Sequence, residues 1–309
     1  MRLRRAERKS FLTGQWGGGY AVGVREGLSK VLETTGPQVL RRSALPYFFT
    51  NFLGRKLFLF LLTIQGLGAF ALITLGVMLK KFRTADRVLW PMVRQEIARS
   101  GLNLLPMFLF LAVALGLLVI GQLVSVAAQY GATNYIGTVM VTVVVRELGP
   151  LLAALLVLAR VGTANVVELG TARALGEVEA LEALGIDPIH YLVVPRVIGM
   201  AAGVFCLTVY LIIGVLVSGY LWAFLQDVPL LPGDYFKQLA GALSWLDFVL
   251  LALKTSSLGF FIAIVTCYHG LAQPLRLEEV SRATVRAVAQ GVVACVLVDA
   301  VFIVLYLVA

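Results

Sequence analysis

The chain has 309 residues, of which 60% are hydrophobic and only 14% are charged, and its mean hydropathy is +0.91. A soluble domain carries about 25% charged residues, so this composition excludes an ordinary soluble enzyme and predicts a polytopic membrane protein. The net charge of +9 comes largely from basic residues at the ends of apolar runs, which indicates topology and contact with anionic headgroups and argues against nucleic-acid binding.

Apolar runs long enough to cross a bilayer, at roughly 20 residues each, follow a basic segment of about 50 residues. They comprise residues 57–79, 104–128, 136–159, 191–222, 246–268 and 288–308. Lysine and arginine concentrate in residues 80–103 and 271–287, whereas the turn over residues 129–135 has no charge. The positive-inside rule therefore assigns residues 80–103, 161–190 and 271–287 to the cytoplasm. The last span then leaves the C-terminus on the periplasmic side.

The first apolar run, residues 57–79, conflicts with this orientation if it crosses the membrane. It would translocate residues 1–56, which carry eleven Lys or Arg. The pattern therefore favours an interfacial or elbow helix that returns to the cytoplasmic side, with a sixth span as the alternative. The predicted fold is an all-α polytopic membrane protein with five transmembrane helices, this N-terminal elbow helix, and a basic cytoplasmic extension over residues 1–50.

A short acidic helix is expected in the loop between the second and third of the five spans. Its apolar residues recur at three-residue intervals, and acidic residues lie between them: Leu175, Val178, Leu181 and Leu184, with Glu177, Glu179 and Glu182. Gly185 is expected to end the helix, and Asp187-Pro188 prevents its continuation. Such a helix either lies on the membrane surface or fits a groove of a cytoplasmic ATPase.

Several motifs between residues 130 and 200 resemble the MlaE/YrbE family of ABC transporter permeases. They are RELGP at residues 146–150, ELG at 168–170, EALEALGIDP at 179–188 and YLVVPR at 191–196. The resemblance makes residues 51–309 the permease domain and implies a homodimer in the bacterial inner membrane. It also implies a cytoplasmic ABC ATPase subunit, a periplasmic MCE-domain partner and a phospholipid or related lipid as substrate. The extension before about residue 45 departs from the family pattern.

The resemblance assigns ATPase coupling to the acidic helix. Its residues are Glu177, Glu179, Leu181, Glu182, Leu184 and Gly185. The sequence lacks the GxxxxGK[ST] phosphate-binding loop, so ATP hydrolysis is expected in the partner chain and this chain is not expected to be an enzyme.

Four ionisable residues, Arg146, Glu147, Lys254 and Asp299, fall at comparable depths inside the predicted spans. A charged side chain at a helix centre costs about 2.5–3.5 kcal/mol on insertion scales, so each should face protein or water. One interpretation is a set of ion pairs that fix helix register, such as Glu147 with Lys254 and Arg146 with Asp299. The other is a substrate site in which the cations attract a lipid phosphate beside an apolar cavity.

The family resemblance favours the substrate site, because it puts the RELGP arginine and glutamate near the lipid pocket. Gln122 is a weaker lining candidate, and an interhelical hydrogen bond explains it equally well. Arg160 and Arg196, at the cytoplasmic ends of spans, are expected to snorkel to the membrane surface.

Two other classes of function compete with an ABC permease. A proton-coupled secondary transporter would use Glu147 and Asp299 as proton carriers, but such transporters usually contain internal repeats, which are not evident. An intramembrane lipid enzyme would need a nucleophile or a metal cluster, and the sequence offers only two separated histidines. Catalytic residues, cofactors and metals are therefore not expected.

Overall fold

The computed structural model describes residues 65–79, 86–123, 126, 130, 136–225, 232–271 and 276–308. The chain divides into Met1–Gln65 and Gly66–Ala309, and the second unit contains nearly all of the described residues. The predicted extension over residues 1–50 and the first half of the 57–79 run lie outside the described residues. The second half of that run forms an apolar helix, Gln65–Leu79, so the choice between elbow and span stays a prediction.

Among the described residues, five helices are long and apolar enough to cross a membrane, which confirms the predicted all-α membrane fold with five long spans. They are Trp90–Leu123, Gly137–Ala174, Ile189–Trp222, Trp245–Leu271 and Leu277–Tyr306. Several reach further than their apolar runs, because helical hydrogen bonding continues through the polar residues at their ends. The second helix extends to Ala174, where the sequence suggested a loop beginning at residue 161.

Each long helix is built from labelled segments. The first contains α4 (Asp86–Ser100), η2 (Leu102–Leu104), α5 (Leu105–Leu115) and η3 (Gly116–Ile120). The second contains α7 (Ile136–Met140), η5 (Val141–Leu148), α8 (Gly149–Val157), η6 (Leu158–Gly162) and α9 (Thr163–Ala174). The third contains η7 (Ile189–Val193) and α11 (Val194–Leu225), and the last two are α13 (Trp245–Leu271) and α14 (Leu277–Val308).

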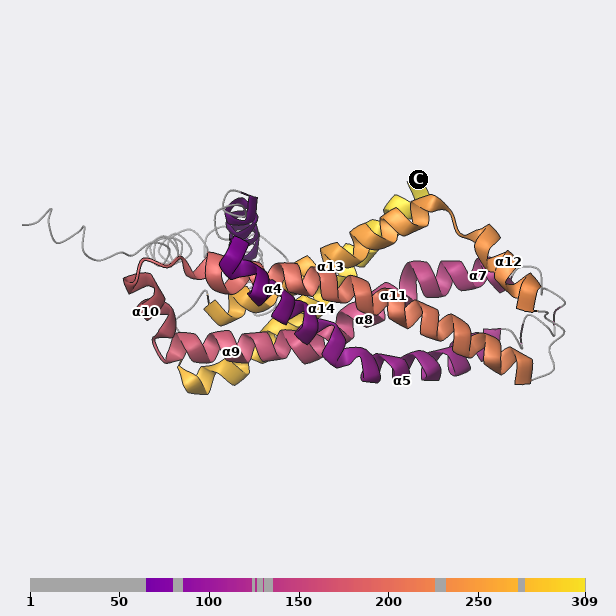
Figure 1. The fold of residues 1–309 in the computed structure, drawn as a ribbon, viewed down its shortest axis with the longest axis horizontal. Coiled ribbons are helices and arrows are strands. Elements are labelled where there is room, and N and C mark those ends of the chain that lie inside the picture. Colours follow the sequence, from indigo (N-terminus) through magenta and orange to yellow (C-terminus); the bar gives the residue numbers. More distant parts are fainter. Residues whose placement is uncertain are drawn as a thin grey trace, which may run out of the picture. The chain divides into compact units, whose positions relative to one another are not determined.

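Two short helices mark opposite ends of this bundle (Figure 1). One is α10 (Glu177–Ala183), between α9 and η7, and the other is α12 (Pro232–Ala242), which packs against α7. These ends are called the α10 end and the α12 end. Within α12, burial raises the pKa of Tyr235 to about 12, so its hydroxyl stays protonated and donates to Leu216 O at 3.2 Å.

The core of the bundle is formed by α11 and α13, which pack against each other along their lengths. Phe108, Met200, Leu207 and Ile262 are fully buried among these helices. Gly259 of α13 permits the close approach, since a Cβ atom there would lie 2.6 Å from Ala201 Cα. Such packing of small residues is a main source of helix association in lipid.

Wide π-helical turns interrupt the second span at η5 and η6. π-Turns shift the side chains that follow them and occur often at functional sites. The turn of η5 contains Arg146 and Glu147 and is followed by Pro150, which has no N–H to donate to Arg146 O four residues earlier. The RELGP motif therefore leaves a backbone carbonyl available inside the bundle.

Candidate functional site

The ammonium group of Lys254, on α13, is the centre of a charged cluster within the bundle. Its Nζ lies 2.9 Å from Glu147 Oε2, 2.7 Å from Asp299 Oδ1 and 2.8 Å from Arg146 O. The ammonium donates hydrogen bonds to Glu147 and to Arg146 O, and its contact with Asp299 is an ion pair. The side chain is completely buried, with 0% exposure.

Burial of Lys254 requires these partners, because an unpaired charge in a low-dielectric interior is strongly unfavourable. The two carboxylates come from η5 and α14, and the carbonyl is the one next to Pro150. The cluster thus joins three spans at a similar depth, as counting residues along the predicted spans suggested. The Glu147–Lys254 pair is confirmed, and Asp299 is the second carboxylate on the same lysine.

Arg146 pairs with Asp247, so the suggested Arg146–Asp299 pair is wrong. Its Nε lies 2.9 Å from Asp247 Oδ1, and its guanidinium lies 5.3 Å from the ring centroid of Tyr306. Asp247 is 96% buried, and its carboxylate also accepts a hydrogen bond from Ser244 N at 2.9 Å, which caps the first turn of α13. Asp247 was not predicted as a site residue, although the Ser-x-x-Asp spacing before an apolar run is typical of a capped helix N-terminus.

Arg146 and Glu147 are the accessible members of the cluster. Their side chains are 30% and 32% exposed, while Lys254 is fully buried and Asp299 nearly so. With Asp247 included, the group holds two cations and three carboxylates. A ligand that approaches the cluster would therefore meet Arg146 and Glu147 first.

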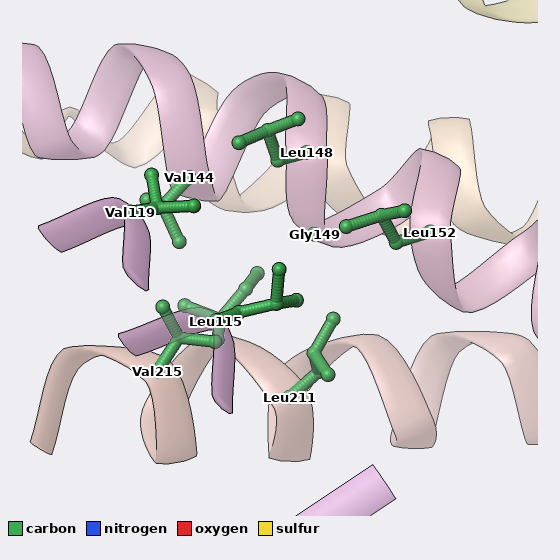
Figure 2. A pocket seen from close by; sticks show the side chains of 9 residues that line it. Leu115, Val119, Val144, Leu148, Gly149, Leu152, Leu211 and Val215 are labelled. Atoms are coloured by element: carbon green, nitrogen blue, oxygen red, sulfur yellow. The ribbon is translucent and has the colours of Figure 1, made fainter. Parts of the chain in front are cut away.

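An apolar cleft is lined in part by η5, the segment that also carries this pair: Val144 and Leu148 line the cleft and flank Arg146 and Glu147 in the chain (Figure 2). It is a narrow, partly open cleft and not a closed cavity. Gly149 keeps α8 close to α11, since a Cβ atom there would lie 2.8 Å from Ile212 Cγ1. All of its lining side chains are aliphatic: Leu115, Val119, Val144, Leu148, Leu152, Leu211, Ile212 and Val215.

Glycine residues bound the acidic helix α10 on both sides. Gly176 and Gly185 have φ angles of +79° and +76°, which glycine adopts without steric cost. At the C-terminal side, Gly185 N donates to Glu182 O and Ile186 N donates to Leu181 O, both at 3.0 Å. This Schellman geometry confirms that Gly185 ends the helix.

The residues assigned to ATPase coupling lie mostly on the outer surface of α10. Glu177, Glu179, Glu182, Leu184 and Gly185 are exposed, and Leu181 is half-buried. Only Val178 of the apolar row is buried, while Leu184 is 75% exposed. Arg173 of α9 pairs with Glu179 at 3.2 Å and holds α10 against the bundle. The bundle therefore presents acidic and apolar side chains together at this end.

Gln122 is exposed near the α12 end of the first span, and no contact among the described residues joins it to the charged cluster. Arg196 is only partly exposed where snorkelling was expected: its side chain is 13% exposed, and it pairs with Glu96 and Glu168. Long-range ion pairing explains the difference, because both partners come from other spans. Within the described residues no group of three or more His, Cys, Asp or Glu is placed to hold a metal ion.

Comparison with known proteins identifies the family. Residues 93–305 match the model of the family Permease MlaE. A probable ABC transporter permease of Rickettsia prowazekii is 38% identical over 52% of this chain and 62% of its own length. The corresponding protein of Rickettsia typhi is 32% identical over 64% of this chain and 76% of its own length.

A more distant relative comes from a plant. The Arabidopsis thaliana protein named TRIGALACTOSYLDIACYLGLYCEROL 1, chloroplastic, is 26% identical over 69% of this chain and 61% of its own length. The family match covers nearly the whole length of the five long helices, the charged cluster and α10. The chain therefore belongs to the MlaE family of ABC transporter permeases.

Proposed function

We propose that this chain moves a phospholipid or related lipid between the bacterial inner membrane and a periplasmic MCE-domain partner, driven by a separate ATPase. The observation that carries the proposal is a charged cluster beside an aliphatic cleft. An amphiphile with an anionic headgroup and acyl chains matches both halves of this arrangement. The Arabidopsis relative, which is named after a glycolipid, adds support for a lipid substrate.

Within the cluster, Arg146 is the residue that contacts the headgroup phosphate. Its guanidinium is partly exposed and is oriented by Asp247 and Tyr306, and arginine forms two-pronged hydrogen bonds with phosphate. Lys254 contributes by holding Glu147 and Asp299 in place, because it is fully buried and already paired with both carboxylates. Gln122 remains a candidate contact toward the α12 end.

The assembly has two copies of this chain and an ATPase bound at the α10 end, which is cytoplasmic. The exposed acidic and apolar side chains of α10 suit a groove with basic rims. The α12 end is periplasmic, receives the MCE-domain partner and contains the C-terminus, while the N-terminus is cytoplasmic. The basic loops support this orientation through the positive-inside rule.

The test is ATP-driven transfer of a photoactivatable phospholipid by the complex reconstituted with its ATPase. Arg146→Ala should lower crosslinking to the cleft by about tenfold, since a hydrogen bond to a charged group contributes about 1.5–3 kcal/mol. The matched control is Arg286→Ala, an exposed arginine of α14. Unchanged crosslinking in Arg146→Ala would remove the headgroup role, and absence of ATP-dependent transfer in the wild type would remove the lipid function.

A proton-coupled transporter of an amphiphile is the second candidate, and the buried Lys254 between two carboxylates favours it. Such intramembrane groups carry protons in many secondary transporters. This function predicts uptake driven by a pH gradient in liposomes that contain this chain alone. Transport that requires ATP and the ATPase subunit would exclude it.

A further inference from the structure

Four side chains near the α10 end form a closed ring of alternating charges, here called the charge ring: Glu96, Arg99, Glu168 and Arg196. Arg99 donates from both terminal nitrogens to the two oxygens of Glu168, one of these bonds being 2.7 Å. Arg196 donates to Glu168 Oε2 at 3.2 Å, and its Nε lies 3.6 Å from Glu96 Oε1. Glu96 lies 4.0 Å from Arg99 and completes the ring.

The members of the charge ring come from helices that have different packing partners. These helices are α4, α9 and α11. The main packing partner of α4 is α11, and Ser100 Oγ donates to Gly199 O at 2.9 Å between them. A Cβ atom on Gly199 would collide with Glu96, so these two helices form a close-packed unit. By contrast, α9 packs mainly against α13 and α14. The charge ring therefore adds a direct polar link between α4 and α9, which are otherwise joined through the packing of α11 against α13.

Glu168 also links the two ends of the segment that contains α10. The segment between Glu168 and Arg196 contains α10, and the direct contact of these two side chains joins the two ends of the segment. The ion pair of Arg173 with Glu179 fixes α10 on α9. A displacement of α10 therefore reaches Glu168 and Arg196 and, through Arg99, α4.

Stability alone does not account for this arrangement. Glu168 is 46% exposed and Arg99 is 30% exposed, and exposed ion pairs contribute little to folding. Two-pronged geometry instead restricts the relative orientation of two helices. We infer that Glu168, held between Arg99 and Arg196, is a positioning residue that makes α4 move with α10 during transport. This inference rests on the proposed function.

Glu168→Gln, Arg99→Gln and the double variant test the inference in the reconstituted complex with its ATPase. Loss of the ring should leave ATP hydrolysis within about twofold of wild type and lower lipid transfer about tenfold, the usual size of a coupling effect. The double variant should match the single variants, because all three lose the same link. The control is Glu278→Gln, an exposed glutamate of α14. Equal loss of hydrolysis and transfer would mean that the ring is only structural and would overturn the inference.

A distance measurement keeps the test independent of lipid transfer. Spin labels at Gln95→Cys on α4 and Ala183→Cys on α10, in a Cys206→Ala background, report whether the two helices move together; all three sites are exposed. The distance should stay constant with and without ATP in the wild-type ring and should broaden in Glu168→Gln. A wild-type distance that changes with ATP would overturn the inference, even if lipid transfer were absent. If Glu168→Gln fails to fold, Arg99→Lys replaces it in both measurements. This variant keeps the positive charge and loses the two-pronged contact with Glu168.

Discussion

Lys254 is retained inside the bundle by two carboxylates and one carbonyl, and their arrangement depends on the residues around Pro150. The sequence placed all four cluster residues at one depth because helical rise converts residue number into depth. It could not assign Arg146 to Asp247, since depth does not give the direction in which a side chain leaves its helix. A π-helical turn changes that direction further.

Removal of the lysine charge alone should destabilise the protein more than removal of the whole charged group. Lys254→Met leaves Glu147 and Asp299 facing each other without a cation, which should cost about 3 kcal/mol of unfolding free energy. The triple variant Lys254→Met, Glu147→Gln, Asp299→Asn should recover most of this loss. Thermal unfolding in detergent measures both, and a triple variant no more stable than Lys254→Met would contradict the role given to the ion pairs.

At the scale of elements, small residues decide how closely α11 and α13 approach. Gly259→Ala would place a methyl group against the backbone of Ala201 and Met200 of α11. Such overpacking should cost about 1–3 kcal/mol and lower the unfolding temperature. The control is Gly241→Ala in α12, where no atom lies within 4 Å of the added Cβ. That control should be neutral or stabilising by up to about 1 kcal/mol, because alanine favours helix over glycine.

The left-handed residue at Gly185 gives a second prediction for an element. Gly185→Ala meets no neighbouring atom, so its cost comes only from the positive φ angle and should be about 1–2 kcal/mol. The loss should appear as faster hydrogen exchange at the amides of residues 185 and 186, which close the end of α10. Gly185→Asn should exchange at a rate closer to wild type, because asparagine tolerates this conformation. Equal exchange in all three proteins would show that α10 does not depend on this cap.

At the scale of the whole molecule, α10 and α12 should lie on opposite sides of the membrane. A membrane-impermeant thiol reagent added to intact cells with a permeabilised outer membrane should label Lys237→Cys in α12 and leave Glu182→Cys in α10 unlabelled. Both positions are exposed, so accessibility to the reagent decides the result. Disruption of the inner membrane should then expose Glu182→Cys. Labelling of Glu182→Cys in intact cells would reverse the proposed topology.

The helical fold, the five long spans and the family followed from the sequence, while the elbow over residues 57–79 stays a prediction. Long apolar runs must be helical in a bilayer, where every backbone N–H and C=O needs an internal partner. Helix ends were less accurate: α9 continues to Ala174, and the first long helix begins before the 104–128 run, in α4. Polar residues such as Glu168 and Arg99 remain helical there because they pair with each other across the bundle.

The sequence by itself determined membrane residence, the five spans, the glycine that ends α10 and the depth of the charged residues, because each depends on local composition or on counting along a helix. Only the tertiary structure decided which charges pair: Lys254 with Glu147 and Asp299, Arg146 with Asp247, and Arg196 with Glu96 and Glu168. These contacts join residues far apart in the chain, so they depend on helix rotation and close packing. Neither property is encoded in any single segment.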